Sequence, residues 1–179
     1  MKTLSLHRFS GHKLHHGFTL LELLLYISIV GGLLSTVVIF FTTTVEARVK
    51  AQTVSEVNQQ GTAALEYITG IIRDADSITT PAVAGSGTTL TIAVPTGSLS
   101  PTVIDLSGTT LQIKEGTGTA VALTDSKVQV SNLLFKNLTR SGTPGVISIS
   151  FLVSRANPNS RNEFDFQKNF YGTAALRWP

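Results

Sequence analysis

The chain has 179 residues, which suits one domain with a single anchor, and its composition is mildly apolar with few charges. It contains no cysteine, which excludes a disulfide framework, a thiolate nucleophile and a cysteine-based zinc site. Its formal net charge of +3 would ordinarily raise the question of a nucleic-acid or anionic-membrane partner. The distribution of the charges along the chain answers that question.

The basic excess is confined to the first 17 residues. Lys2, Arg8 and Lys13 are three of the 14 Lys and Arg residues, which leaves 11 for the rest of the chain against 11 Asp and Glu. All four histidines also lie in 1–17. Without 1–17, which we interpret as a basic leader, the chain is formally neutral. No nucleic-acid partner is expected, because the sequence has no basic stripe interleaved with aromatic residues.

Residues 18–41 form one apolar run, FTLLELLLYISIVGGLLSTVVIFF, with Glu22 as its single charged residue. As a helix, its 24 residues extend about 36 Å, enough to cross a hydrocarbon core of about 30 Å. We therefore predict a transmembrane helix over 18–41. Short basic segments stay on the cytoplasmic side, so the C-terminal part is expected outside. A secretory signal peptide is the alternative, although this run is longer than usual and lacks an A-x-A-like cleavage site.

The helix is expected to continue through 42–80 as an amphipathic segment, because no proline occurs before Pro81. Apolar residues at helical spacing form one stripe, which we expect to face the domain's own sheet. Gly61 and Ala64 lie on this stripe and would permit close approach to the sheet. The stripe consists of Val54, Val57, Gly61, Ala64, Ile68, Ile71 and Ala75.

Residues 81–179 have a different character, since all six prolines and most glycines lie there among short alternating runs. Ile147, Ile149, Phe151 and Val153 form the clearest alternation. The pattern predicts an antiparallel sheet of roughly four to seven strands, with a polar loop at 155–162 before the last strand or strands near 164–176. The expected fold class is α+β, with a long N-terminal helix packed on a C-terminal antiparallel β-sheet.

The junction Gly17-Phe18-Thr19-Leu20-Leu21-Glu22 resembles the prepilin cleavage and methylation motif of type IV pilins and pseudopilins. The resemblance rests on a basic leader, a glycine, a hydrophobic residue after it and an acid alone in an apolar run. It implies that a prepilin peptidase cuts after Gly17 and that Phe18 becomes a methylated N-terminus. Glu22 then takes the place of the family's acid at the fifth mature position. The closing segments resemble those of minor pseudopilins.

Membership of this family would make the chain a structural subunit of a type IV pilus-like or type II secretion-like filament. It implies other pilin or pseudopilin subunits, an inner-membrane assembly platform and membrane lipid as partners. The expected location is the cytoplasmic membrane, with the C-terminal domain outside, and then a periplasmic or cell-surface filament. A membrane-anchored adhesion or binding domain and a DNA-uptake pilin are the alternatives. The sequence does not distinguish between pilus, secretion and competence machines.

Glu22 has a role that follows from membrane energetics alone. An ionised carboxylate in lipid costs about 2.5–3.5 kcal/mol on insertion scales, so it is normally paired or neutralised. No Lys or Arg occurs between Lys13 and Arg48. The α-amine of a cut chain at Phe18 is therefore the cation at the right depth, and we expect Glu22 to accept that amine from an adjacent subunit. The alternative is a glutamate that reaches the nearby interface.

Gly31 and Gly32 lie in the middle of the apolar run, where we assign them to helix packing. Small residues allow transmembrane helices to approach closely, which is the use that we favour. A locally unwound stretch, which the resemblance suggests for packed filaments, is the alternative. The proline that many relatives have further along is absent, and Ile39 stands near the comparable place.

Catalysis is not expected from the outer domain. Without His or Cys after residue 17, and without a G-x-S-x-G, S-x-x-K or phosphate loop, we predict no enzyme activity and no cofactor. Glu163 and Asp165 are a weak calcium candidate beside the polar loop, but Arg155 and Arg161 should compete for them, so we favour a solvated loop. Asn137 begins a short N-glycosylation pattern, which we attribute to chance.

Overall fold

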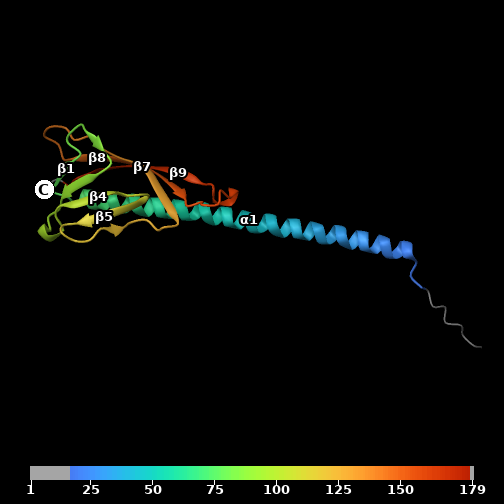
Figure 1. Ribbon diagram of the computed structural model, residues 1–179. Helices are drawn as coiled ribbons and strands as arrows, with labels where there is room; N and C mark the ends of the chain where they lie inside the picture. Colours follow the sequence, from blue (N-terminus) through green and yellow to red (C-terminus); the bar gives the residue numbers. More distant parts are fainter. Residues whose placement is uncertain (1–16, 178–179) are drawn as a thin grey trace, which may run out of the picture. The chain divides into compact units, whose positions relative to one another are not determined.

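The computed structural model describes residues 17–177 (Figure 1). A single α-helix of 54 residues, α1 (Leu20–Arg73), is followed by antiparallel strands, which confirms the α+β class. The chain divides into two compact units, one up to Thr44 and one from Val45 onward. We describe the two units separately.

The N-terminal unit contains the first part of α1, and its apolar side chains are exposed. Hydroxyl groups in this part donate back to the carbonyl oxygen three or four residues earlier. Ser35 Oγ donates to Gly31 O at 2.8 Å, and Thr36 Oγ1 donates to Gly32 O at 2.9 Å. Hydroxyls bonded in this way carry no unsatisfied donor into an apolar environment.

The C-terminal unit contains two antiparallel sheets, where the sequence predicted one sheet of roughly four to seven strands. Sheet A has five strands in the order β1-β3-β4-β5-β6, and sheet B has four in the order β2-β7-β8-β9. In Figure 1 the second part of α1 runs along both sheets. The strands of sheet A are β1 (Ser77–Thr80), β3 (Leu90–Ala93), β4 (Thr102–Ser107), β5 (Thr110–Glu115) and β6 (Val121–Ala122). Those of sheet B are β2 (Ser86–Gly87), β7 (Val128–Asn137), β8 (Val146–Arg155) and β9 (Gln167–Ala175).

Two short 3-10 helices, η1 (Gly97–Leu99) and η2 (Asn162–Phe164), lie in the connections β3–β4 and β8–β9. The second of them belongs to the polar loop that the sequence predicted at 155–162. The single strand β9 follows this loop, within the region 164–176 in which the last strand or strands were expected.

Side-chain alternation along the strands builds the core. On β8, Ile147, Ile149, Phe151 and Val153 are buried and their neighbours are not. On β7 the buried positions change from even to odd numbers after Val130, because a bulge lies between Ser131 and Leu134. A bulge adds one residue to a strand and so exchanges the faces of everything beyond it.

The buried face of α1 consists of Thr53, Val57, Gly61, Ala64, Ile68 and Ile72. The predicted stripe is buried at Val57, Gly61, Ala64, Ile68 and Ala75, whereas Val54 and Ile71 are only half-buried. Thr53 is buried on this face, although threonine is counted as polar when a sequence is searched for apolar stripes. Gly61 lies against the ring of Phe170 on β9.

The helix ends at Arg73, whereas the sequence predicted an amphipathic helix as far as residue 80. The C-terminal end of α1 is determined by the start of strand pairing with β3, and not by Pro81. Asp76 N donates to Ala93 O at 2.8 Å, and Ser77 pairs with Ala93 to begin β1. Residues 78–80 are β-branched, which favours a strand over a helix.

Candidate functional site

Thr19 caps the N-terminus of α1. Its side-chain Oγ1 accepts a hydrogen bond from Glu22 N at 3.2 Å, and its backbone carbonyl accepts one from Leu23 N at 3.1 Å. A threonine cap of this kind satisfies an amide that would otherwise have no partner in the helix. Sequence reasoning missed Thr19, although the spacing Thr19-x-x-Glu22 is that of a capping box and could have revealed it.

Glu22 lies in the first turn of α1, and its side chain is exposed. The amides at a helix N-terminus favour a negative charge there by about 0.3–1 kcal/mol at an exposed position. No salt bridge joins Glu22 to another residue of the described chain. In the uncut chain the nitrogen of Phe18 is a peptide nitrogen, so the expected cation would arise only on cleavage.

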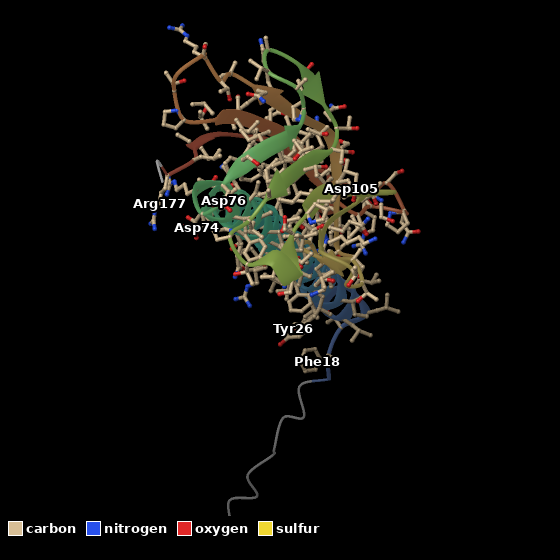
Figure 2. The ribbon with its side chains drawn as sticks, turned by 90° about the vertical axis from the view of Figure 1, so that its left-hand side faces the viewer. Phe18, Tyr26, Asp74, Asp76, Asp105 and Arg177 are labelled. Atoms are coloured by element: carbon tan, nitrogen blue, oxygen red, sulfur yellow. The ribbon has the colours of Figure 1, made fainter. Side chains whose placement is uncertain are left out.

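Gly17 and Phe18 precede the helix in exposed backbone without regular secondary structure. Phe18 is 76% exposed, and Figure 2 shows its ring before the helix and that of Tyr26 on the first part of α1. The peptide bond between Gly17 and Phe18 is thus accessible and lies just before a rigid element. An extended, exposed bond is what a peptidase requires of its substrate.

The apolar surface of the first part of α1 is continuous. The helix is long and apolar enough to cross a membrane, and none of its most apolar stretch is buried in the structure. Gly31 and Gly32 lie within this surface, and a Cβ atom added at either position would meet nothing within 4 Å. Their open flank leaves room for another helix, but no other α-helix is present in residues 17–177.

Gly61 and Ala64 belong to the C-terminal unit, apart from the other residues assigned to the site. Both are buried on the face of α1 that packs against sheet B. The predicted site residues therefore form three groups: the helix start, the Gly31-Gly32 pair in the apolar stretch, and the core of the domain.

The residues around the calcium candidate, Glu163 and Asp165, form contacts with basic side chains. Arg161 forms an ion pair with Glu163, and the backbone oxygens of Asn162 and Asp165 accept hydrogen bonds from Lys50 Nζ. Arg155, which was expected to compete for these acids, forms an ion pair with Glu56 on α1 instead. Within residues 17–177 there is no cluster of three or more His, Asp or Glu side chains that could hold a metal ion.

Asn137, the first residue of the glycosylation pattern, has a structural role. Its side chain is 2% exposed, its Nδ2 donates to Pro81 O at 2.8 Å, and its Oδ1 accepts from Thr139 N at 3.0 Å. Both ends of the amide are therefore used inside the fold.

A scan against protein-family models and searches of curated proteins and of solved structures find no match to this chain. The function must accordingly be argued from the residues and their geometry.

Proposed function

We propose that this chain is a structural subunit of a type IV pilus-like or type II secretion-like filament, made with a leader that is cut after Gly17. The observation that carries the proposal is the start of α1. There an exposed Gly17-Phe18 bond is followed at once by a capped helix with one acid, Glu22, in an otherwise apolar and fully exposed surface. Each part of this arrangement has a use in filament assembly.

The exposed bond serves the processing step. Hydrolysis after Gly17 would release 1–17 and leave a positively charged amine on Phe18, at the same end of the helix as Glu22. The same step would remove the three basic residues Lys2, Arg8 and Lys13, which retain the leader on the cytoplasmic side of the membrane.

The exposed apolar surface would hold the subunit in the membrane before assembly and would form the subunit contacts of the filament. Before assembly it would lie in lipid, and after assembly it would be covered by the same surface of neighbouring subunits. Glu22 is costly in lipid, by about 2.5–3.5 kcal/mol on insertion scales, unless a cation satisfies it. The amine of a neighbouring Phe18 removes that cost in the filament, so the pairing favours the assembled state and fixes the axial register of adjacent helices.

The experiment is expression of the full chain in a host with a prepilin peptidase, followed by mass spectrometry of the mature N-terminus and by analysis of sheared filaments. The mature chain should begin at Phe18 with one added methyl group. Glu22→Ala should lower the sheared fraction strongly, whereas Glu46→Ala, which removes an acid beyond the apolar run, should not.

A different mature N-terminus, or wild-type filament yield from Glu22→Ala, would reject the proposal. A chain that is cut and stays in the membrane, but never enters the sheared fraction, would favour the anchored adhesion or binding domain.

A further inference from the structure

A groove runs between α1 and sheet A in the C-terminal unit, from β6 to the connection between β3 and β4. It is made of two cavities of about 430 Å³ and 280 Å³, which share Leu99 and Glu115 and therefore adjoin. Tyr67 on α1 and Val121 on β6 form opposite rims, and the buried Ile113 is part of the lining. The groove is thus a feature of one rigid corner of the domain, bounded by a helix, a strand and the η1 turn.

The lining of this groove is apolar with an acidic margin. Tyr67, Leu99 and Val121, which line the same cavity, are 47%, 39% and 60% exposed and give the groove an apolar surface. Glu115 and Asp74 are the charged residues of the lining, and no Lys or Arg contributes to it. Asp74 pairs with Arg177 at 3.6 Å, and Figure 2 shows these two residues close together at the end of α1. Glu115 has no ion pair within residues 17–177.

The loop between β7 and β8 has the complementary chemistry. Leu138 is 44% exposed, and Lys136 and Arg140 on either side of it are exposed. Neither cation takes part in an ion pair in the described chain. The exposed Leu138 is therefore flanked by two cations, Lys136 near the end of β7 and Arg140 in the loop.

Hydrogen bonds hold this loop in one conformation. Leu138 N donates to Val146 O at 2.8 Å, and Thr143 Oγ1 donates to Arg140 O at 2.8 Å. Thr139 Oγ1 accepts from Val146 N at 3.0 Å. A loop that is already ordered loses little conformational entropy when it binds.

The loop lies beside β1, and the larger cavity of the groove lies at β6, the other outer strand of sheet A. Gly145, at the end of the loop, lies against Ile78 of β1, and β1 and β6 are the two outer strands of this sheet. Four inter-strand spacings of about 4.8 Å separate these edges by roughly 19 Å. None of the loop residues lines either cavity, so contact between this loop and a groove requires a second copy of the chain.

We propose that the β7–β8 loop of one copy docks in the groove of the next, with Leu138 between Tyr67 and Val121 and with Arg140 paired to Glu115. Because the two surfaces differ, the contact is heterologous, and repetition of a heterologous contact that does not close gives an open helical assembly. The contact deepens the proposed function, on which it rests, by naming the surfaces through which the outer domains of successive subunits meet.

The absence of native cysteine makes cross-linking a clean test. Two differently tagged full-length chains are co-expressed in membranes, one with Thr119→Cys at the groove and one with Ser141→Cys in the loop, and are oxidised briefly. A mixed disulfide dimer is expected. The matched control replaces Ser141→Cys with Asn169→Cys, which is exposed on β9 opposite Leu152, further from the loop, and should give no mixed dimer.

Charge reversal tests the chemistry of the contact. Glu115→Arg should lower the cross-linking yield by at least about fivefold, because it opposes two cations, and Arg140→Glu in the second chain should restore it. Equal yields with Ser141→Cys and Asn169→Cys, or a yield that Glu115→Arg leaves unchanged, would overturn the proposal. So would intact filaments in which the Thr119→Cys chain forms no mixed disulfide, a result that would point to another occupant of the groove.

The outcome is distinguishable from failure of the proposed function. Filaments in the sheared fraction without the mixed dimer would leave the filament role standing and reject the docking contact. The mixed dimer without filaments in the sheared fraction would support the docking contact and reject the filament role.

Discussion

The ring of Phe170 lies directly against the backbone of Gly61, so that a Cβ atom at position 61 would overlap the ring. Phe170 in turn stacks on Phe151 with ring centroids 5.6 Å apart and planes inclined by 17°. One glycine of α1 thus determines how closely the helix approaches β9 and, through it, β8. A single added methyl group can therefore test how tightly the helix packs on sheet B.

Gly61→Ala should destabilise the C-terminal unit by about 1–3 kcal/mol, because the added methyl group forces the Phe170 ring out of its place. The measurement is chemical unfolding of the full chain in detergent micelles, followed by circular dichroism. Gly70→Ala is the matched control, since nothing lies near that position and alanine favours the helix by up to about 1 kcal/mol. A stabilising effect of both substitutions would show that the ring yields without cost.

Glu56→Ala should destabilise the domain by about 1–3 kcal/mol, because it leaves the Arg155 guanidinium half-buried without its carboxylate. The two side chains are each 18% exposed, so solvent screens the pair only in part. Lys127 Nζ lies 3.5 Å from Glu56 as well, but at 59% exposure it should add little. Glu66→Ala, at an exposed position of the same helix, should change the free energy of unfolding by less than about 0.5 kcal/mol. Similar losses from both variants would contradict the assignment.

Asn137→Asp should destabilise the fold by about 1–3 kcal/mol at neutral pH, since it places a carboxylate oxygen against the carbonyl of Pro81 in a buried site. Acidification should recover part of this loss, because a protonated carboxyl group can donate to that carbonyl. Unfolding at pH 7 and pH 4, each relative to the wild type at the same pH, measures both effects. Asn169→Asp on the exposed side of β9 is the control and should show neither.

Thr19→Ala should lower the stability of the first turn of α1 by about 1 kcal/mol, because the amide of Glu22 loses its side-chain acceptor. Amide hydrogen exchange of residues 20–23 in micelles should become faster, and exchange beyond Ser28 should not change. Thr19→Ser keeps the hydroxyl acceptor and should behave like the wild type. Equal exchange rates in the alanine and serine variants would assign the cap to another group.

Much of the fold follows from sequence periodicity, which reports local geometry. The alternation of Ile147 to Val153 predicted β8, and the apolar run at 18–41 predicted a helix long enough to cross a membrane. Strand β4 was not recognised, because Asp105 interrupts its apolar pattern; its carboxylate accepts a hydrogen bond from Gln112 across the sheet. The division into two sheets was also missed, since alternation reveals the inner face of a strand but not its neighbours.

The contacts that depend on distant parts of the chain could not be predicted. The pair Glu56 and Arg155 joins residues 99 positions apart, and a single sequence gives no sign of such a partner. The Gly17 to Glu22 junction was identified because its residues are consecutive. The groove between Tyr67 and Val121 was not, because its walls come from a helix, a turn and a hairpin that only the fold brings together.

The polar contacts of α1 with the C-terminal segments occur at its Lys50, Glu56 and Asn58, ahead of the fully apolar contacts of Ile68 and Ile72. A pulling force on the N-terminal end of this unit's helix therefore loads these electrostatic contacts, together with the buried Val57 among them, before it loads Ile68 and Ile72. Charge pairs weaken as ionic strength rises, whereas apolar contacts do not. The force needed to begin peeling the helix from its domain should consequently depend on salt, while the force needed to complete the process should not.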